Sequence, residues 1–199
     1  AEIYIVDDIS QYAPYGEIVS ADPTRKGYVQ KTNQNYDSRM VGVISLTPGL
    51  TMGRPKEEDY GKTVLVGLQG RVMANVSNIN GDISPGDKIT SSTIAGFGMK
   101  ATRAGQIIGK AMETFSIDNG EKIACPPETP AGIICGRILI NLENGFYDPD
   151  ALLVNKSDYQ IENKDNNFLV KRTSGATNIS RVGGFDTLLS ANLEAGNAF

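Results

Sequence analysis

The sequence predicts an all-β protein: a barrel-like or sandwich domain built from two pseudo-repeated halves, with a mixed, partly irregular C-terminal extension. Three observations predict this fold. Gly, Pro, Asn and Asp interrupt the chain roughly every 8–12 residues, which is the spacing of sandwiches and barrels. The runs between these interruptions are short and rich in β-branched residues, and helical periodicity is scarce. A glycine-led motif also occurs twice.

The repeated motif begins with Gly, an acid, any residue, a β-branched residue and a hydroxyl residue. A Gly-aromatic pair follows, with a Lys near a Thr, and then an apolar pair around a Gly. These parts occupy residues 16–20, 27–32 and 41–44 in the first copy and 86–91, 96–102 and 107–110 in the second. Two such halves can close one barrel or sandwich around a shared core, because neither buries its apolar face alone. The alternative is a coincidence between turn-rich β sequences.

Strands are expected where short apolar runs lie between turn residues. We predict them at residues 17–21, 27–31, 40–45, 64–67, 70–75, 88–91, 99–101, 106–111, 123–125 and 133–142. Asn80-Gly81 predicts a two-residue turn, in which both central positions require positive φ. Residues 48–62 read as a polar segment between the halves: either a solvated connector, or a loop that covers a groove or contacts a neighbour.

The predicted domain boundary lies near Phe146, giving a module over 1–145 and an extension over 146–199. The extension is rich in Asn, Asp, Gln and Lys around a predicted turn at 163–167, which is followed by a strand at 168–173 and a short element at 185–197. It carries too little apolar sequence to fold alone, so we expect it to pack on the module or on neighbouring subunits, or to stay partly disordered. The chain starts abruptly at Ala1 without a signal-like segment, which suggests a fragment.

Composition and charge exclude some classes of partner. The net charge is −4, the pI is about 4.9 and the basic residues are scattered, so we expect no nucleic-acid binding. The longest apolar stretch, residues 132–140, is far shorter than the ~20 residues of a membrane-spanning helix, so we expect no membrane insertion. The two cysteines, Cys125 and Cys135, form either a disulfide, as in proteins outside the cell, or two buried free thiols.

The chain contains no histidine, which removes the commonest base of catalytic pairs and the commonest metal ligand. We expect no cofactor and no metal. Calcium could lie on Asp82 and Asp87, or on Asp148 and Asp150, but Asp in turns usually hydrogen-bonds its own backbone. The only candidates for acid–base chemistry are Glu2, Asp7 and Asp8, because paired carboxylates can divide that work when proximity raises the pKa of one of them.

Ordered blocks of sequence over roughly residues 1–142 resemble two related groups of proteins. The blocks lie at residues 1–4, 16–20, 42–45, 48–49, 66–72 and 81–87. One group is the β-rich module of phage tail-fibre and bacterial cell-surface proteins. The other is the autoproteolytic intramolecular-chaperone peptidase domain that ends some phage appendage proteins. The second resemblance implies that Glu2 takes part in self-cleavage, although the chain starts at Ala1 and continues well past the module.

These observations give three hypotheses about function. The first is a structural and interaction module of a phage tail fibre or bacterial surface appendage, non-catalytic as it stands, extracellular or on the virion, and assembled as a homo-oligomer. By family analogy we expect a trimer. Its predicted assembly surface consists of Phe168, Leu169, Val170, Leu188, Leu189 and Leu193. The alternative is a self-cleaving assembly chaperone that uses Glu2, with Asp7 or Asp8 in support.

The third hypothesis is a carbohydrate-binding surface module, which would bind a glycan receptor on a cell. Such modules usually stack sugars on exposed aromatic rings. The chain has no Trp, so Tyr12, Tyr15, Tyr36 and Tyr60 would have to supply the rings.

Overall fold

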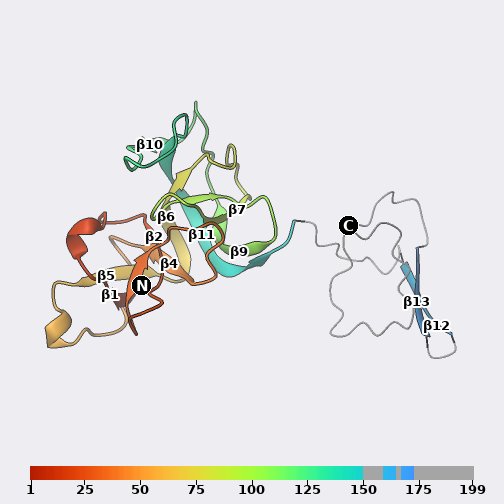
Figure 1. The fold of residues 1–199 in the computed structure, drawn as a ribbon, viewed down its shortest axis with the longest axis horizontal. Helices are drawn as coiled ribbons and strands as arrows, with labels where there is room; N and C mark the ends of the chain where they lie inside the picture. Colours follow the sequence, from red (N-terminus) through yellow and green to blue (C-terminus); the bar gives the residue numbers. More distant parts are fainter. Residues whose placement is uncertain (150–158, 165–166, 173–199) are drawn as a thin grey trace. The chain divides into compact units, whose positions relative to one another are not determined.

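The computed structural model describes residues 1–149, 159–164 and 167–172, and it divides the chain into two units, Ala1–Pro149 and Asp150–Phe199. The first unit consists of two neighbouring groups of strands (Figure 1). Its elements are β1 (Glu2–Ile5), η1 (Ile9–Gln11), β2 (Ile18–Ala21), β3 (Val29–Lys31), β4 (Met40–Ile44), η2 (Glu57–Asp59), β5 (Thr63–Gly67), β6 (Gly70–Ser77), β7 (Lys88–Ser91), β8 (Gly98–Lys100), β9 (Gly105–Ala111), β10 (Glu121–Ile123) and β11 (Cys135–Tyr147).

The all-β prediction is confirmed, since the regular structure is strand apart from two short 3₁₀ turns among the described residues. Every strand predicted between residues 17 and 142 is present; the strand at 88–91 has the predicted bounds, and the others have shifted ends. The strand β1 was not predicted. In the second unit, β12 (Tyr159–Lys164) pairs antiparallel with β13 (Asn167–Arg172), close to the predicted strand at 168–173. The sequence did not predict β12, because its residues are mostly polar.

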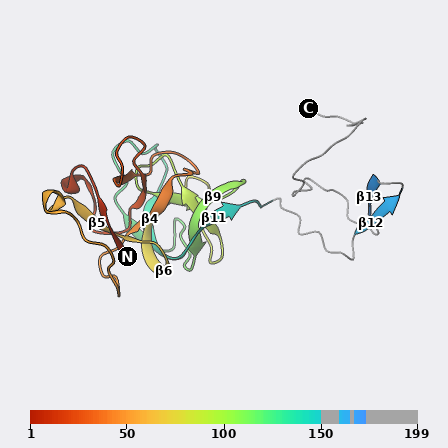
Figure 2. The same ribbon diagram turned by 90° about the horizontal axis from the view of Figure 1, so that it is seen from below.

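The two halves have the same strand order. The first half pairs its strands in the order β1-β5-β4-β2-β3, and an isolated parallel bridge between Ile5 and Tyr28 closes the ring. The second half pairs β6-β11-β9-β7-β8, and a parallel pair between Val76 and Gly98 closes it. We call these the first barrel (residues 1–67) and the second barrel (residues 70–147). Figure 2 shows them side by side, with β5 and β4 on one side and β9 and β11 on the other.

The register of pairing repeats as well. Val19, in β2, lies opposite Lys31 of β3 and Gly42 of β4. The residues in the same relation in the second barrel are Ile89, Lys100 and Gly109. The sequence motif therefore marks a structural duplication in which each copy supplies the second, third and fourth strands of one barrel.

The acid and the lysine of the motif form the same ion pair in both barrels. In the first, Lys31 Nζ lies 2.8 Å from Glu17 Oε1, and in the second, Lys100 Nζ lies 2.8 Å from Asp87 Oδ2. Each pair joins the start of the second strand to the third strand. This explains why an acid follows the first glycine and why a lysine recurs in both copies.

Each half forms its own closed ring of strands. The repeat had suggested a single barrel or sandwich formed by both halves around a shared core. The first barrel has its own buried cluster, which includes Val19, Ile44 and Val66. The cluster inside the second barrel also takes in Ile18, Met40 and Val43 from the first barrel. Neighbouring residues of β2 therefore serve two cores: Val19 points into its own barrel and Ile18 packs against the other. Burial of each such side chain is worth about 1.5–3 kcal/mol, which holds the barrels together.

Two loops also join the barrels by polar contacts. Ile18 N donates to Gly96 O (2.9 Å), which fixes a loop of the second barrel on β2 of the first. In return, Ser91 Oγ in β7 accepts from Asp37 N (2.8 Å) in a loop of the first barrel. Tyr36, which has a φ of 54°, lies in the same loop as Asp37. Its hydroxyl oxygen accepts hydrogen bonds from the backbone N–H groups of Thr102 and Arg103, which follow β8. Each barrel thus holds a loop of the other.

Two sequence interpretations are corrected by these connections. Residues 48–62 do not connect the two halves. They form part of the loop between β4 and β5 of the first barrel, and residues 68–69 connect the two barrels. The turn near Asn80-Gly81 has positive φ at Gly81 only, with Gly81 N donating to Asn78 O (2.8 Å). It forms no hairpin, because β6 pairs with β11 and β8 and not with the strand that follows it.

The glycine of the fourth strand gives the first testable prediction. A Cβ on Gly109 would lie 2.5 Å from Asn141 O in β11, and a Cβ on the equivalent Gly42 would lie 2.2 Å from Gly67 O in β5. We expect Gly109→Ala to lower the free energy of unfolding by about 1–3 kcal/mol through overpacking. Gly49→Ala, where a Cβ meets nothing within 4 Å, is the control and should change it by less than about 0.5 kcal/mol. Equal midpoints for the two variants in urea would contradict the prediction.

The buried Asp37 gives a pH-dependent prediction. Burial acts to raise the pKa of Asp37, but hydrogen bonds from the Arg39 guanidinium and backbone outweigh it and hold the pKa below its ordinary value. Because the folded-state pKa is lowered, the ionised carboxylate stabilises the fold above the unfolded-state pKa of about 3.9, and this stabilisation is lost as the pH falls below it.

We therefore expect the free energy of unfolding at pH 7 to be about 1–3 kcal/mol lower for Asp37→Asn than for wild type. The difference should shrink between pH 4 and pH 2.5 in urea titrations. Glu57→Gln, at an exposed position, is the control and should track wild type throughout. A difference between wild type and Asp37→Asn that stays constant down to pH 2.5 would refute the assignment.

Candidate functional site

The structure gives the three acids predicted for catalysis separate partners. Glu2 Oε2 in β1 accepts from Tyr4 OH (3.2 Å), whereas Asp7 pairs with the Arg25 guanidinium (2.5 Å). Asp8 caps η1: hydrogen bonds from the Ser10 hydroxyl and N–H and from the Gln11 amide lower the pKa of Asp8. Each of the three acids thus has its own partner, and none of these contacts joins one of the acids to another.

Of the aspartates considered as calcium ligands, Asp87 has other partners. Asp87 Oδ2 accepts from Ser84 N (2.8 Å) and pairs with Lys100 Nζ, so it serves a turn and an ion pair. Asp82 is exposed and Asp150 lies outside the described residues. Within the part of the chain that the structure describes, no group of three or more Asp, Glu or Cys residues is placed to hold a metal ion. In the same residues, no helix is both long and apolar enough to span a bilayer.

The four tyrosines proposed for sugar stacking have different neighbours. Arg137 lies 4.1 Å from the ring centroid of Tyr15, and a cation also lies over the ring of Tyr12 and that of Tyr36. Tyr60, which is 56% exposed, is the one with an open ring. Cations therefore lie over three of the four rings.

The residues predicted for assembly lie in the second unit. Phe168, Leu169 and Val170 are on β13, where the structure describes the backbone but not the side chains. Leu188, Leu189 and Leu193 lie outside the described residues. The assembly surface therefore stays a prediction.

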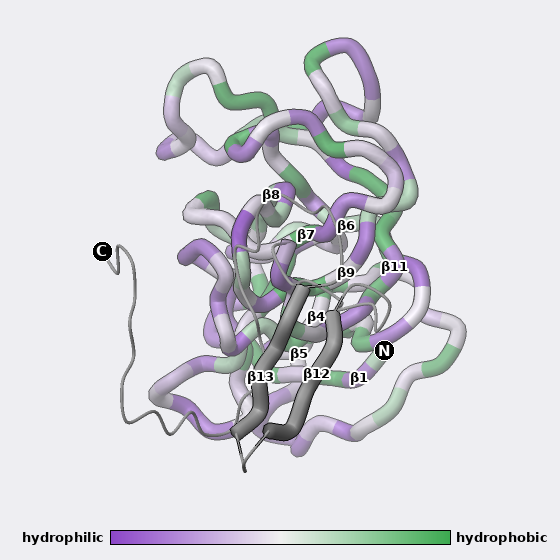
Figure 3. The backbone as a smooth tube through the Cα atoms, turned by 90° about the vertical axis from the view of Figure 1, so that its right-hand side faces the viewer, coloured by the Kyte–Doolittle hydropathy of each residue, from purple (hydrophilic) through white to green (hydrophobic). Residues whose placement is uncertain are grey.

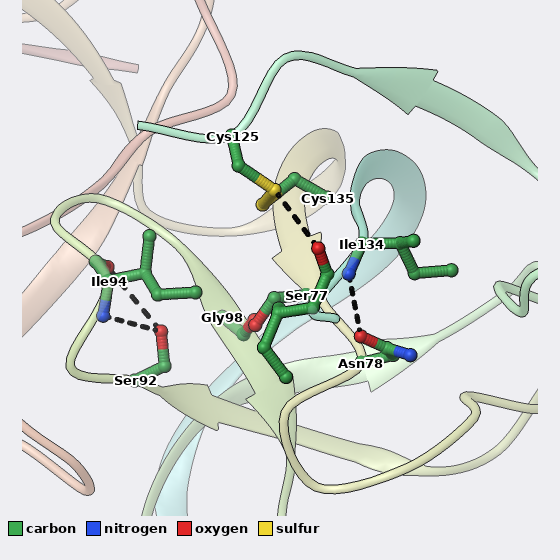
Figure 4. Close-up of a disulfide and its surroundings, with 9 residues drawn as sticks. Ser77, Asn78, Ser92, Ile94, Gly98, Cys125, Ile134 and Cys135 are labelled. Carbon is green, nitrogen blue, oxygen red and sulfur yellow. Dashed lines mark hydrogen bonds between the residues drawn. A yellow bond between two sulfur atoms is a disulfide. The ribbon is translucent and has the colours of Figure 1, made fainter. Parts of the chain in front are cut away.

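Cys125 and Cys135 are joined by a disulfide (Figure 4). The bond closes the β10–β11 hairpin beside the pair Ile123 and Cys135. The end of the same loop is fixed to the residue after β6 by two hydrogen bonds, from Ile134 N to Asn78 Oδ1 (2.9 Å) and from Asn78 N to Ile134 O (3.2 Å). The disulfide thus anchors a loop that projects from the second barrel, and β10 stands clear of the ring in Figure 1.

Exposed apolar side chains concentrate in two equivalent loops, which join the fourth strand to the fifth in each barrel. We call them the first insert loop (residues 45–62) and the second insert loop (residues 112–134). Of the eight large hydrophobic side chains that the described residues leave exposed, six are on these loops: Leu46, Leu50, Met52, Tyr60, Met112 and Ile117. Figure 3 shows hydrophobic positions in loops of the first unit as well as in its strands. Loops on a rigid barrel are common binding elements.

A groove of about 340 Å³ lies where the first insert loop begins, and we call it the β6 groove. Its floor is the outer face of β6 and β11, where Met73 lies opposite Leu139. Its walls are Tyr15, residues 44–47 and Arg71. The second insert loop begins beside it, because Met112 N donates to Leu139 O (2.9 Å). Both insert loops therefore start at one apolar groove.

The sequence interpretation missed the β6 groove, although a signal for it was present. Val72 and Ala74 alternate with Met73 along β6, so a strand with a buried face places Met73 outward. Leu139 alternates in the same way with the buried residues Ile138 and Ile140, so β11 places it outward as well. Outward apolar residues on two paired strands indicate a contact surface, but the pairing of β6 with β11 cannot be read from the sequence.

Comparisons with known proteins give one structural likeness. No protein-family model matches the chain, and no curated protein matches it. Among solved structures, the C-terminal fragment of bacteriophage phi29 gene product 12 is similar, with 14% sequence identity and a TM-score of 0.44. The match covers 72% of this chain and 99% of that fragment. A likeness of this size carries no conclusion about function.

The disulfide gives a prediction for the second insert loop. The two cysteines are ten residues apart, and cross-linking a loop of this length stabilises a fold by about 2–3 kcal/mol. We expect a reductant to lower the free energy of unfolding of wild type by that amount and so to lower its unfolding midpoint. Cys125→Ala with Cys135→Ala should show the lower midpoint with or without reductant. A wild-type midpoint that is insensitive to reductant, together with two free thiols in a thiol assay, would contradict the bond.

Proposed function

We propose that this chain is a structural interaction module of a phage tail fibre or a bacterial surface appendage, with binding rather than turnover as its role. The observation that carries the proposal is the concentration of exposed apolar side chains on the two insert loops of a duplicated barrel. Loops held on a rigid scaffold are common binding elements, and exposed apolar side chains on them supply contact area for a partner. The rigid barrels hold both loops at fixed positions.

The appendage context is supported by the sequence blocks that resemble tail-fibre and cell-surface modules. The disulfide supports an oxidising, extracellular or virion location, because such bonds persist outside the cytosol. No observation in the described residues specifically favours self-cleavage by Glu2 or sugar binding by the tyrosines, so neither is proposed here.

The proposal includes assembly into a homotrimer through the apolar residues of the extension. We expect sedimentation equilibrium at micromolar concentration to give three times the chain mass of 21.3 kDa. Leu169→Asp with Leu188→Asp should give a monomer with an unchanged unfolding midpoint for the barrels. Ile117→Asp, an exposed apolar position on the second insert loop, is the matched control and should stay trimeric. A wild-type monomer would contradict the trimer.

A further inference from the structure

Within the described part of the chain, no strand lies beside the outer edge of β6 at a position where the first barrel has one. In the first barrel, residues 50–53 of the first insert loop run parallel to β1 and bridge Glu2 to Met52. Three hydrogen bonds hold them: Ala1 N to Leu50 O (2.7 Å), Met52 N to Ala1 O (2.9 Å) and Ile3 N to Met52 O (3.0 Å). The chain thus covers the edge of β1 with its own strand.

The duplication identifies the equivalent edge in the second barrel. Ile44 lies opposite Val66, as Ala111 lies opposite Ile140, so β5 corresponds to β11. Val66 in turn lies opposite Glu2, and Ile140 lies opposite Val72. The residues that correspond to Ala1 and Ile3 are therefore Arg71 and Met73.

The backbone groups of Arg71 and Met73 point to this open edge. In an antiparallel pair, residues alternate between facing the partner strand and facing away. Asn75 N donates away from β11, to Gly16 O (2.7 Å), so Met73 and Arg71, two and four residues earlier, also face away from β11. On this edge β6 pairs with β8 at Val76 alone, and among the described residues no strand reaches Arg71 or Met73.

The β6 groove lies beside these groups. Arg71, Val72 and Met73 line it on one side, and residues 44–47 line the other. Leu46 is 58% exposed at its wall, and Met73 and Leu139 form an apolar floor. An edge with free N–H and C=O groups beside an apolar pocket is the arrangement that binds peptides by strand addition.

We propose that the β6 groove binds an extended peptide segment of a partner protein, added as a parallel strand beside Arg71–Met73. The peptide accepts a hydrogen bond from Met73 N, donates one to Arg71 O, and places an apolar side chain over Met73 and Leu139. Met52 and its neighbours in the first barrel show the chemistry of the occupant: an apolar residue between a hydroxyl residue and a glycine. The inference deepens the proposed function by naming one partner surface.

The test uses a synthetic peptide with the sequence of residues 47–55, because residues 50–53 occupy the equivalent edge of the first barrel. Titration into the full chain, followed by hydrogen exchange, should show binding and slower exchange of the Met73 amide. Without peptide, that amide should exchange faster than the amide of Ile3, which is bonded to Met52 O.

Two variants probe the two parts of the site. Met73→Pro removes the N–H that faces the groove and leaves the bonds to β11 in place, as edge positions of strands allow. Leu139→Glu places a charge on the apolar floor. Both should weaken peptide binding at least tenfold, whereas Ile117→Ser should bind as wild type does. Unchanged unfolding midpoints would show that the variants are folded.

Failure of this inference is distinguishable from failure of the proposed function. The peptide-binding proposal would be overturned if the Met73 amide were protected from hydrogen exchange without peptide, or if no binding were detected at millimolar peptide. Neither result would affect the mass measurement that tests the trimer. If wild type self-associates and both Met73→Pro and Leu139→Glu abolish that association, the occupant is a second copy and the partner assignment is wrong.

Discussion

Close approach of the fourth and fifth strands is the constraint on which each barrel depends. Gly42 and Gly109 stand at the same position of the repeat, and in both places a carbonyl oxygen of the next strand occupies the space of a side chain. A Cβ at this position would push the fourth strand away from the fifth. A closed ring of five strands cannot easily accommodate the larger spacing between them. The apolar pair around Gly in the motif thus encodes ring closure, and the ion pair between its acid and lysine fixes the adjoining strand.

Closure in each half leaves the insert loops free to differ. Strands one to four are related by near-constant sequence offsets, and the two copies diverge most between strands four and five. There the first copy has 18 residues that turn back onto the edge of β1. The second copy has 23 residues that form β10 and carry the disulfide. Loops of unequal length in equivalent places are the expected result when a barrel supplies the stability and the loops carry the contacts.

Local sequence predicted the strands well because each strand lies between turn residues. Each also either alternates apolar with polar residues or is a short apolar run. The repeat even matched the correct residues across the barrels, such as Val19 with Ile89. What local sequence could not supply was the partner of each strand. Residues 48–62 were interpreted as a connector between halves because a polar, glycine-rich segment looks the same inside a barrel as between two. The β6 groove was missed for the same reason, since it depends on β6 pairing with β11 from 58 or more residues away.

The difference between the two edges follows from this divergence of the insert loops. The first insert loop satisfies the exposed edge of β1 with backbone hydrogen bonds, which protects that barrel from unwanted strand pairing. The second insert loop is tied instead to Asn78 and closed by the disulfide, and among the described residues none of its backbone groups bonds to Arg71 or Met73. Anchoring that loop therefore leaves one strand edge open beside an apolar floor. In a protein whose proposed role is to hold partners, that opening is a place where a partner chain can complete the sheet.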